Sequence, residues 1–308
     1  MAGLAAAWRL SDLGRCVRVL EKSRGIGGRL ATRRTRDGLT FDHGAQFAKA
    51  RDAGFAGYLD QARRAGAAAD WTPLGPDGAE GALPVGLPGM SGLVAPLARG
   101  IEIGFAATVT GLSAGDGWVV EGEGFDTFEV SAVLLAIPAA QAQSLLRPVA
   151  PQTAGELDRV EMDPCLAAMV AFDAPLATPV GLWRDPSPSL QWVSRENAKP
   201  GRADGVDRWV VHGAPRWSRE HLERDKDETA AMILPMAADV WRRAGAAVPE
   251  PARLIGHRWR YARTRRPLGR PFLADASGTL LAGGDWALGP RVEAAYLSGI
   301  AMADALRR

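Results

Sequence analysis

The first part of the chain changes its hydrophobic period from that of a helix to that of a strand. Over residues 3–13 the apolar side chains recur near helical spacing, and Gly14 follows as a natural helix end. Residues 16–23 (CVRVLEKS) then alternate β-branched and polar side chains. The pattern therefore predicts a helix followed by a strand that ends in Glu21.

Further along the chain, the same two periods predict more helices and short strands. Residues 132–138 form a continuous apolar run, which is typical of a parallel strand buried on both faces. Residues 279–283 predict a second buried strand, and a helix of small residues follows from Val292. The other predicted elements are an amphipathic helix over residues 55–66, short strands over residues 101–138 and a helix around residues 219–246.

The opening helix and strand have the order of the second half of a dinucleotide-binding βαβ unit. The helix begins at a turn of small residues, Ala2 and Gly3, and the strand ends in the acid Glu21, which Lys22 follows. In such units the turn lets the backbone approach a pyrophosphate at the helix N-terminus, and the acid accepts a hydrogen bond from the ribose. We therefore expect these four residues to bind a dinucleotide.

The first strand and the first two glycines of that unit are missing from the sequence. A central parallel strand is packed on both faces, so its loss would remove on the order of 10 kcal/mol of hydrophobic stabilisation, comparable with the net stability of a domain. We therefore expect Met1 to be an internal methionine of a longer reading frame. The alternative is a degenerate protein that has lost its cofactor.

Two compact motifs follow the acid. In EKSRGIGGRLATRR (residues 21–34), Gly27 and Gly28 let the chain pass close to a cofactor, and Arg29 is suited to pair with a pyrophosphate oxygen. FDHGAQF (residues 41–47) comes next. This order resembles FAD enzymes of the glutathione-reductase and amine-oxidase type. The resemblance implies that three residues of the second motif lie near the flavin ring or ribityl chain: Gly44, Ala45 and Gln46.

The C-terminal segment resembles the closing motif of the same enzymes. It reads TLLAGGDWALGPRVEAAYLSGIAMADAL over residues 279–306. The resemblance implies that the aspartate hydrogen-bonds the ribityl chain and that the helix N-terminus points its positive dipole at the flavin. The expected cofactor-binding residues are Gly284, Asp285, Val292 and Glu293. It also implies that the backbone of Val109 meets the adenine, with a simple core valine as the alternative.

Three segments of the second half resemble renalase-like proteins in particular: residues 191–202, 209–223 and 257–262. Apart from the missing strand, the whole chain thus resembles renalase-like FAD-dependent oxidoreductases of the flavin amine oxidase superfamily. The cofactor implied is non-covalent FAD. The fold class implied is α/β, with an FAD-binding Rossmann-like domain of the glutathione-reductase and amine-oxidase type and a second α+β substrate domain on a mixed or antiparallel sheet.

The segment HRWRYA alternates, so that His257, Trp259 and Tyr261 share one face of a strand. A flat, partly apolar wall suits a planar substrate that lies on the flavin ring, so we predict these three as the catalytic residues. The alternative places Trp259 in the domain core. The arginines of residues 263–270 are candidates for substrate phosphates, with a solvated basic loop as the alternative.

The order of these motifs divides the chain into two discontinuous domains. We expect the FAD-binding domain to comprise residues 1–50, 86–146 and 272–308, and the substrate domain to comprise residues 51–85 and 147–271.

Composition excludes several other classes of protein. Apolar residues make up 47% of the 308 and charged residues 23%, with a net charge of +2, which implies no strong attraction to nucleic acid or membrane. No apolar run approaches the length of a membrane span. Cys16 and Cys165 provide neither a disulfide framework nor a metal site, and the histidines lack metal-like spacing. We expect a cytoplasmic protein.

The renalase likeness implies oxidation of a reduced nicotinamide dinucleotide, or an isomer of one, by hydride transfer to flavin. Oxygen would be the acceptor and hydrogen peroxide the product. Such chemistry needs no strong protein base, because the donor is already activated and the cofactor carries the difficult step.

Two other functions remain open from the sequence. One is an amine or porphyrinogen oxidase on the same fold. The chain has no cysteine after Cys165 to tether a flavin, Lys199 and Lys226 lie in no recognised motif, and a tyrosine pair is hard to assemble from Tyr58, Tyr261 and Tyr296. The other is a flavin-free binding protein with a degenerate cofactor site.

Overall fold

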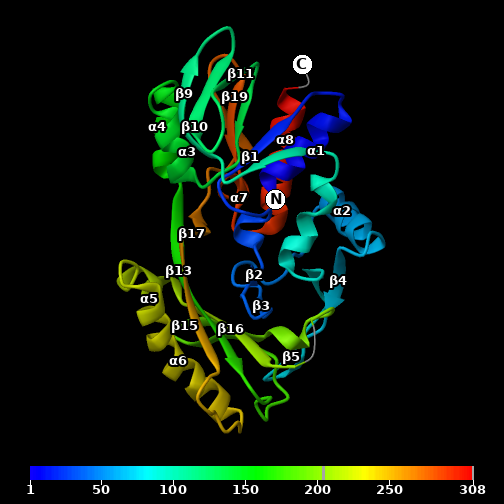
Figure 1. The fold of residues 1–308 in the computed structure, drawn as a ribbon, viewed down its shortest axis with the longest axis vertical. Helices are drawn as coiled ribbons and strands as arrows, with labels where there is room; N and C mark the ends of the chain where they lie inside the picture. Colours follow the sequence, from blue (N-terminus) through cyan, green and yellow to red (C-terminus); the bar gives the residue numbers. More distant parts are fainter. Residues whose placement is uncertain (203–204, 307–308) are drawn as a thin grey trace.

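The computed structural model describes residues 1–202 and 205–306. The predicted opening elements are present as helix α1 (Ala2–Asp12) and strand β1 (Arg18–Glu21), with Gly14 in the left-handed conformation after the helix. Helix α1 packs on the C-terminal helix α8 (Val292–Ala305), as Figure 1 shows. The contact is close, because a Cβ atom on Gly299 would lie 2.2 Å from the carbonyl oxygen of Ala2.

Parallel strands form two separate groups beside this helix pair. Strand β1 pairs with β8 (Glu102–Phe105), and β12 (Val133–Leu135) pairs with β19 (Leu280–Gly283), which β18 (Phe272–Ala274) joins in antiparallel order. Both β12 and β19 fall inside the apolar runs that predicted buried strands. Side chains from both groups line one large cavity.

A three-stranded antiparallel meander and two helices cover the β12–β19 group. The strands are β9 (Thr108–Ala114), β10 (Trp118–Glu123) and β11 (Phe128–Val130), and the helices are α3 (Ala139–Leu146) and α4 (Pro151–Glu156). They share an apolar core with short helix α7 (Asp285–Leu288), in which the indole of Trp286 is fully buried.

The second half of the chain builds a five-stranded antiparallel sheet in the order β14-β15-β16-β13-β17. Its strands are β13 (Glu161–Phe172), β14 (Leu182–Ser187), β15 (Leu190–Arg195), β16 (Asp207–Gly213) and β17 (Arg253–Arg266). Helices α5 (Pro215–Glu220) and α6 (Lys226–Arg243) cover one face, while the other face looks toward β2, β3 and the cavity (Figure 1).

The helix expected around residues 219–246 is present as α6, which begins later than expected, and the short helix α5 precedes it. The chain breaks between them because Asp225 caps the second helix: its carboxylate accepts hydrogen bonds from the backbone N–H groups of Asp227 at 2.7 Å and Glu228 at 3.2 Å. Since an N-cap residue has an extended backbone, no helix passes through it.

The segment after residue 50 forms a small excursion with its own helix. Asp52 caps α2 (Ala53–Arg64), and β4 (Ala68–Trp71) pairs with β7 (Leu83–Gly86). The remaining strands are β5 (Leu74–Gly75), β6 (Gly78–Ala79), β2 (Arg33–Arg34) and β3 (Thr40–Phe41), and single 3-10 turns span Gly28–Leu30, Met90–Val94, Pro96–Ala98, Leu157–Arg159 and Glu196–Ala198.

In the described ranges, no helix has the length and hydropathy that crossing a membrane requires. Nor do three His, Cys, Asp or Glu side chains of these residues form a group able to hold a metal ion.

Candidate active site

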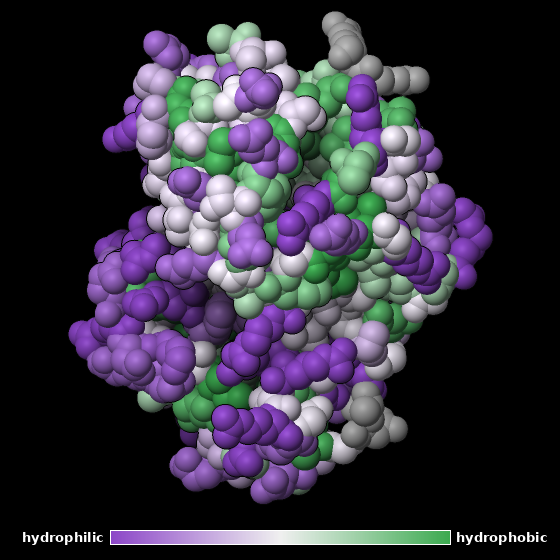
Figure 2. Space-filling model, turned by 45° about the horizontal axis from the view of Figure 1, so that its top comes forward, coloured by the Kyte–Doolittle hydropathy of each residue, from purple (hydrophilic) through white to green (hydrophobic). Residues whose placement is uncertain are grey.

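One cavity of about 3000 Å³ runs between the parallel strands, the Gly27–Arg29 loop and the large sheet. In Figure 2 the lower part of the view is largely hydrophilic, and hydrophobic residues show over much of the upper part. We call the side formed by the N- and C-terminal motifs the cofactor wall and the side formed by the five-stranded sheet the substrate wall.

The N-terminus of α1 and the end of β1 meet on the cofactor wall. Ala2 and Gly3 line the cavity, and a Cβ atom on Gly3 would lie 3.3 Å from the Cβ of Ala136, so only a small residue fits there. Glu21 and Lys22 also line it, and the Glu21 carboxylate accepts a hydrogen bond from the backbone N–H of Ser23 at 2.8 Å. The structure thus brings these four positions to one wall of the cavity, and their contact with a dinucleotide stays a prediction.

The glycine-rich loop brings Arg29 to the same wall. Gly27 and Gly28 have φ values of 120° and 55°, which favour glycine, and both line the cavity. The Arg29 guanidinium donates to Asp285 Oδ2 at 2.9 Å and forms a second, short contact with Oδ1. The sequence suggested that these two residues bind different parts of the cofactor, whereas the structure pairs them with each other at the edge of the cavity.

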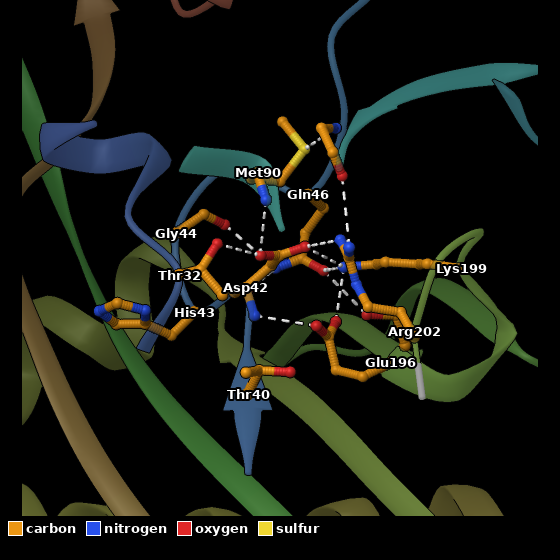
Figure 3. A network of polar contacts seen from close by, with 12 residues as sticks. Thr32, Thr40, Asp42, His43, Gly44, Gln46, Met90, Glu196, Lys199 and Arg202 are labelled. Carbon is orange, nitrogen blue, oxygen red and sulfur yellow. Dashed lines mark hydrogen bonds and ion pairs between the residues drawn. The ribbon is translucent and has the colours of Figure 1, made fainter. Parts of the chain in front are cut away.

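The Asp42–Gln46 turn separates the cofactor wall from the substrate wall. A Cβ atom on Gly44 would lie 2.1 Å from the carbonyl oxygen of Arg29, and the Ala45 N–H donates to that same oxygen at 2.9 Å. Gly44, Ala45 and Gln46 all line the cavity. The side-chain amide of Gln46, however, is fully used by internal hydrogen bonds, so its polar atoms face the protein (Figure 3).

The C-terminal motif contributes Gly284, Asp285 and Val292 to the cavity, and Val109 lines it from β9. Glu293 differs from the expectation. Within the described residues it does not border the cavity. Its buried carboxylate accepts hydrogen bonds at Oε1 from the backbone N–H groups of Arg51 and Asp52, the second at 2.7 Å. These hydrogen bonds connect the segment before α2 to the start of α8.

Aromatic and imidazole rings form the substrate wall. His257, Trp259 and Tyr261 all line the cavity from β17. The ring centroids of His257 and Trp259 lie 4.3 Å apart, and the His43 ring stacks on Trp259 at 5.0 Å and meets His257 edge-on at 4.4 Å. The alternating arginines of β17 also border the cavity, but their guanidinium groups bond to neighbours: Arg258 donates to the Leu222 carbonyl, and Arg260 pairs with Glu223.

The carbonyl oxygen of His43 ties this wall to the turn. It accepts a hydrogen bond from Trp259 Nε1 at 2.9 Å, and His212 Nε2 lies 3.2 Å away. Because a carbonyl only accepts, His212 carries its proton on Nε2. Burial lowers the pKa of His43 to about 3 and the pKa values of His212 and His257 to about 4, so all three rings are neutral at pH 7.

Sequence reasoning missed His43 and His212 as part of the wall, although His43 stands inside the FDHGAQF motif. It also left open whether the arginines of residues 263–270 bind substrate phosphates or form a solvated basic loop. Most of them pair on the surface: Arg265 and Arg266 with Glu161, and Arg270 with Glu156. Arg263 is the one of these arginines that lines the cavity in the part of the chain described.

Comparison with known proteins agrees with this arrangement. The pattern of NAD(P)-binding Rossmann-like domains matches residues 1–61, and the pattern of flavin-containing amine oxidoreductases matches residues 51–307. The chain belongs to the flavin-containing amine oxidoreductase family. It is an FAD-dependent oxidoreductase, as the sequence motifs indicate, and the α/β fold with a Rossmann-like domain is confirmed.

Solved structures share the fold over nearly the whole chain. One is assigned as a protoporphyrinogen oxidase from Exiguobacterium sp. 255-15, with 14% identity and a TM-score of 0.75, covering 99% of this chain and 96% of that one. Wild-type putrescine oxidase bound to putrescine has 15% identity and a TM-score of 0.72, with 100% and 97% covered. Cyclohexylamine oxidase from Brevibacterium oxydans IH-35A has 12% identity and a TM-score of 0.72, with the same coverage.

The residues of the cofactor wall fit FAD. Gly44 keeps a side chain out of a place where backbone approaches backbone, and Gly3 lies against the Cβ of Ala136. The N-terminus of α1 at Met1 is within electrostatic reach of Glu21 and of the Arg29–Asp285 pair. When bound, FAD supplies the acceptor for a hydride. The protein supplies the surfaces that hold and orient the reacting molecules.

Proposed function

We propose that this enzyme oxidises a reduced nicotinamide dinucleotide, or an isomer of one, with oxygen as the electron acceptor. A hydride, with its two electrons, leaves the dihydropyridine ring. Oxygen takes up those two electrons with two protons, one of them from solvent, and hydrogen peroxide is released.

The observation that carries this proposal is the charge of the cavity beyond the cofactor wall. Arg33, Arg34 and Arg263 line it, and among the described residues none of the three has an ion-pair partner. Arg33 lies within electrostatic reach of both His43 and His257, so positive charge stands beside the ring cluster. The described acids that line the cavity are Glu21 and Asp285 on the cofactor wall and Asp185 on β14. Such a field favours a substrate that carries phosphate and disfavours a cationic amine.

The ring cluster supports the same class of substrate. Neutral imidazoles and an indole offer a flat surface without charge, which suits a dihydropyridine ring. Hydride transfer from such a ring needs no strong base in the protein. His257, Trp259 and Tyr261 stay our candidates for the residues that contact the substrate.

The features that would serve an amine oxidase lie away from the cavity. Tyr58 and Tyr296 stack on each other at 5.1 Å inside the apolar core instead of forming a cage, and neither is among the described lining residues. Lys199 is also absent from that lining, and its ammonium is paired with two buried carboxylates. These placements weaken the amine interpretation.

Rapid mixing of the anaerobic holoenzyme with candidate donors tests the proposal. We expect reduced nicotinamide dinucleotides or their isomers to bleach the flavin absorbance, and putrescine and cyclohexylamine not to do so. Bleaching by an amine alone would reject the proposal. Bleaching by a porphyrinogen alone would also reject it, and would indicate that the basic residues bind the carboxylates of that substrate.

A charge variant refines the result. Because Arg33 and Arg34 are exposed, we expect the double change Arg33→Ala/Arg34→Ala to raise KM for the dinucleotide about fivefold at low salt. Arg36→Ala is the matched control, since Arg36 is an exposed arginine of the same segment that does not line the cavity. Equal KM values for both variants would show that the pair does not contact the substrate.

A further inference from the structure

A closed network of four charges lies behind the Asp42–Gln46 turn (Figure 3). Asp42 Oδ1 accepts hydrogen bonds from Thr32 Oγ1 at 2.7 Å and from the Met90 backbone N–H at 2.9 Å, while Oδ2 receives Lys199 Nζ at 3.4 Å and a short contact from Arg202. The backbone N–H of Asp42 donates to Glu196 Oε2 at 2.9 Å. The network therefore joins the turn to residues that follow β15.

The network is balanced in charge and sealed from solvent. Its two carboxylates and two cations have side chains that are at most 1% exposed. Burial by itself would raise the pKa of Asp42, but Lys199 and Arg202 hold that pKa below its usual range. A buried ion group of this kind contributes little net stability compared with apolar packing, so its clearest effect is on the position of the segments that it joins.

All three ammonium protons of Lys199 are donated to acceptors inside the network. It donates to Glu196 Oε1 at 2.5 Å, to Gln46 Oε1 at 2.9 Å and to Asp42. Since an ammonium has three donors, none is left for a ligand. Any influence of Lys199 on the cavity therefore passes through the residues that it holds.

Gln46 is the link from Lys199 to the cavity. Its Oε1 accepts from Lys199 and from Ser194 Oγ at 3.0 Å, and its Nε2 donates to the carbonyl oxygens of Asp42 and Gly44, the latter at 3.2 Å. Those carbonyls belong to the turn that touches the Arg29 backbone on one side and Trp259 on the other. Fixing the Gln46 amide therefore fixes the turn between the two walls.

We propose that Lys199 is a positioning residue that acts on bound FAD from outside the cavity. Through Gln46 and Asp42 it sets where Gly44 and the His43 carbonyl lie, and thereby the shape of the cofactor site. This proposal concerns FAD alone, so it does not depend on which substrate the enzyme oxidises.

The test uses the double variant Lys199→Met/Glu196→Gln, which removes one positive and one negative charge and leaves the Asp42–Arg202 pair. The readouts are the Kd for FAD, the visible absorption spectrum and the midpoint potential of the bound flavin. We expect FAD to bind about tenfold more weakly, with shifted absorption maxima and a changed potential. Wild-type values for all three readouts would overturn the proposal.

A matched control separates positioning from general loss of stability. Arg195 and Asp207 form a partly buried ion pair in the same sheet, with Arg195 Nε 3.0 Å from Asp207 Oδ1, and no described contact joins their side chains to the turn. We expect Arg195→Met/Asp207→Asn to destabilise the protein without moving the flavin readouts. If both double variants change the flavin equally, the effect is one of general stability and the proposal fails.

A second variant answers the case in which the double variant does not fold. Gln46→Met keeps all four charges and cuts the connection from Lys199 to the turn carbonyls. We expect the same direction of change in the flavin spectrum and Kd. A wild-type spectrum and Kd in this variant would also overturn the proposal.

Discussion

The two walls of the cavity are built in different ways. The cofactor wall depends on small residues and local motifs: Gly44 admits close approach of the Arg29 backbone, and Gly3 lies against the Cβ of Ala136. The substrate wall consists of large side chains from several strands, with His212 on β16 and His257 and Trp259 on β17. The difference teaches that one wall recognises a fixed cofactor by backbone geometry, while the other presents rings and charges that can differ between enzymes of one fold.

The Asp42–Gln46 turn lies between the two walls, so we expect a substitution in this turn to have the largest effect on stability and FAD binding. In Gly44→Ala the new Cβ would lie 2.1 Å from the Arg29 carbonyl oxygen, and backbone has to move to relieve the clash. We expect a loss of about 3 kcal/mol in the free energy of unfolding and loss of FAD binding. Denaturant unfolding and flavin absorbance measure the two effects.

Gly25→Ala is the control for that change. Gly25 lies in the glycine-rich loop and also lines the cavity, but a Cβ atom there would meet nothing within 4 Å. We expect nearly wild-type stability and FAD binding. A similar loss in both variants would mean that glycine flexibility, and not the close approach, matters in this region.

The substrate wall predicts a dependence of stability on pH. Burial lowers the pKa of His212 to about 4 in the folded chain, against about 6.5 when unfolded, so the unfolded chain binds more protons between these values. The stability that neutral His212 contributes is fully present above pH 6.5. Between pH 7 and pH 5 the free energy of unfolding falls by about 2 kcal/mol because of this residue. Unfolding free energies at the two pH values measure it.

His212→Asn sharpens this prediction. The asparagine amide keeps a donor for the His43 carbonyl but does not titrate. We expect this variant to lose less unfolding free energy between pH 7 and pH 5 than the wild type, the difference being the part that His212 contributes. An unchanged fall would assign the pH dependence to the other groups of the cluster, His43 and His257.

The smallest expected effect on folding comes from the cofactor wall. In Arg29→Lys the charge remains, but the two-point contact with Asp285 is lost, because an ammonium cannot reproduce the planar fork. We expect a change below about 1 kcal/mol in the stability of the apoprotein and roughly tenfold weaker FAD binding. Titration of apoprotein with FAD measures the affinity, and equal affinity would show that the pair serves the fold alone.

Much of the cofactor wall was predictable, since its motifs are local. The helix, strand and acid at Glu21, the Gly27–Arg29 loop and the strand before Asp285 all lie where the sequence placed them. The exceptions are instructive. Nothing in the sequence indicated that Arg29 would pair with Asp285, or that Glu293 would turn toward the backbone of Arg51, because each partner is more than 200 residues away.

The substrate wall was only partly predictable. Strand alternation put His257, Trp259 and Tyr261 on one face, but it gave no sign that His43 and His212 would join them. The domain boundaries stay a prediction, as do the catalytic residues.

The sequence by itself determined the family, the cofactor and the local elements that carry the cofactor motifs, because glycines, an acid at a strand end and hydrophobic periods act over short distances. The tertiary structure decided which charges meet. It buried Lys199 among Asp42, Glu196 and Gln46, and it left Arg33 and Arg34 facing the cavity. The physical reason is that burial and partnership of a charge depend on the packing of distant segments, which no local pattern records.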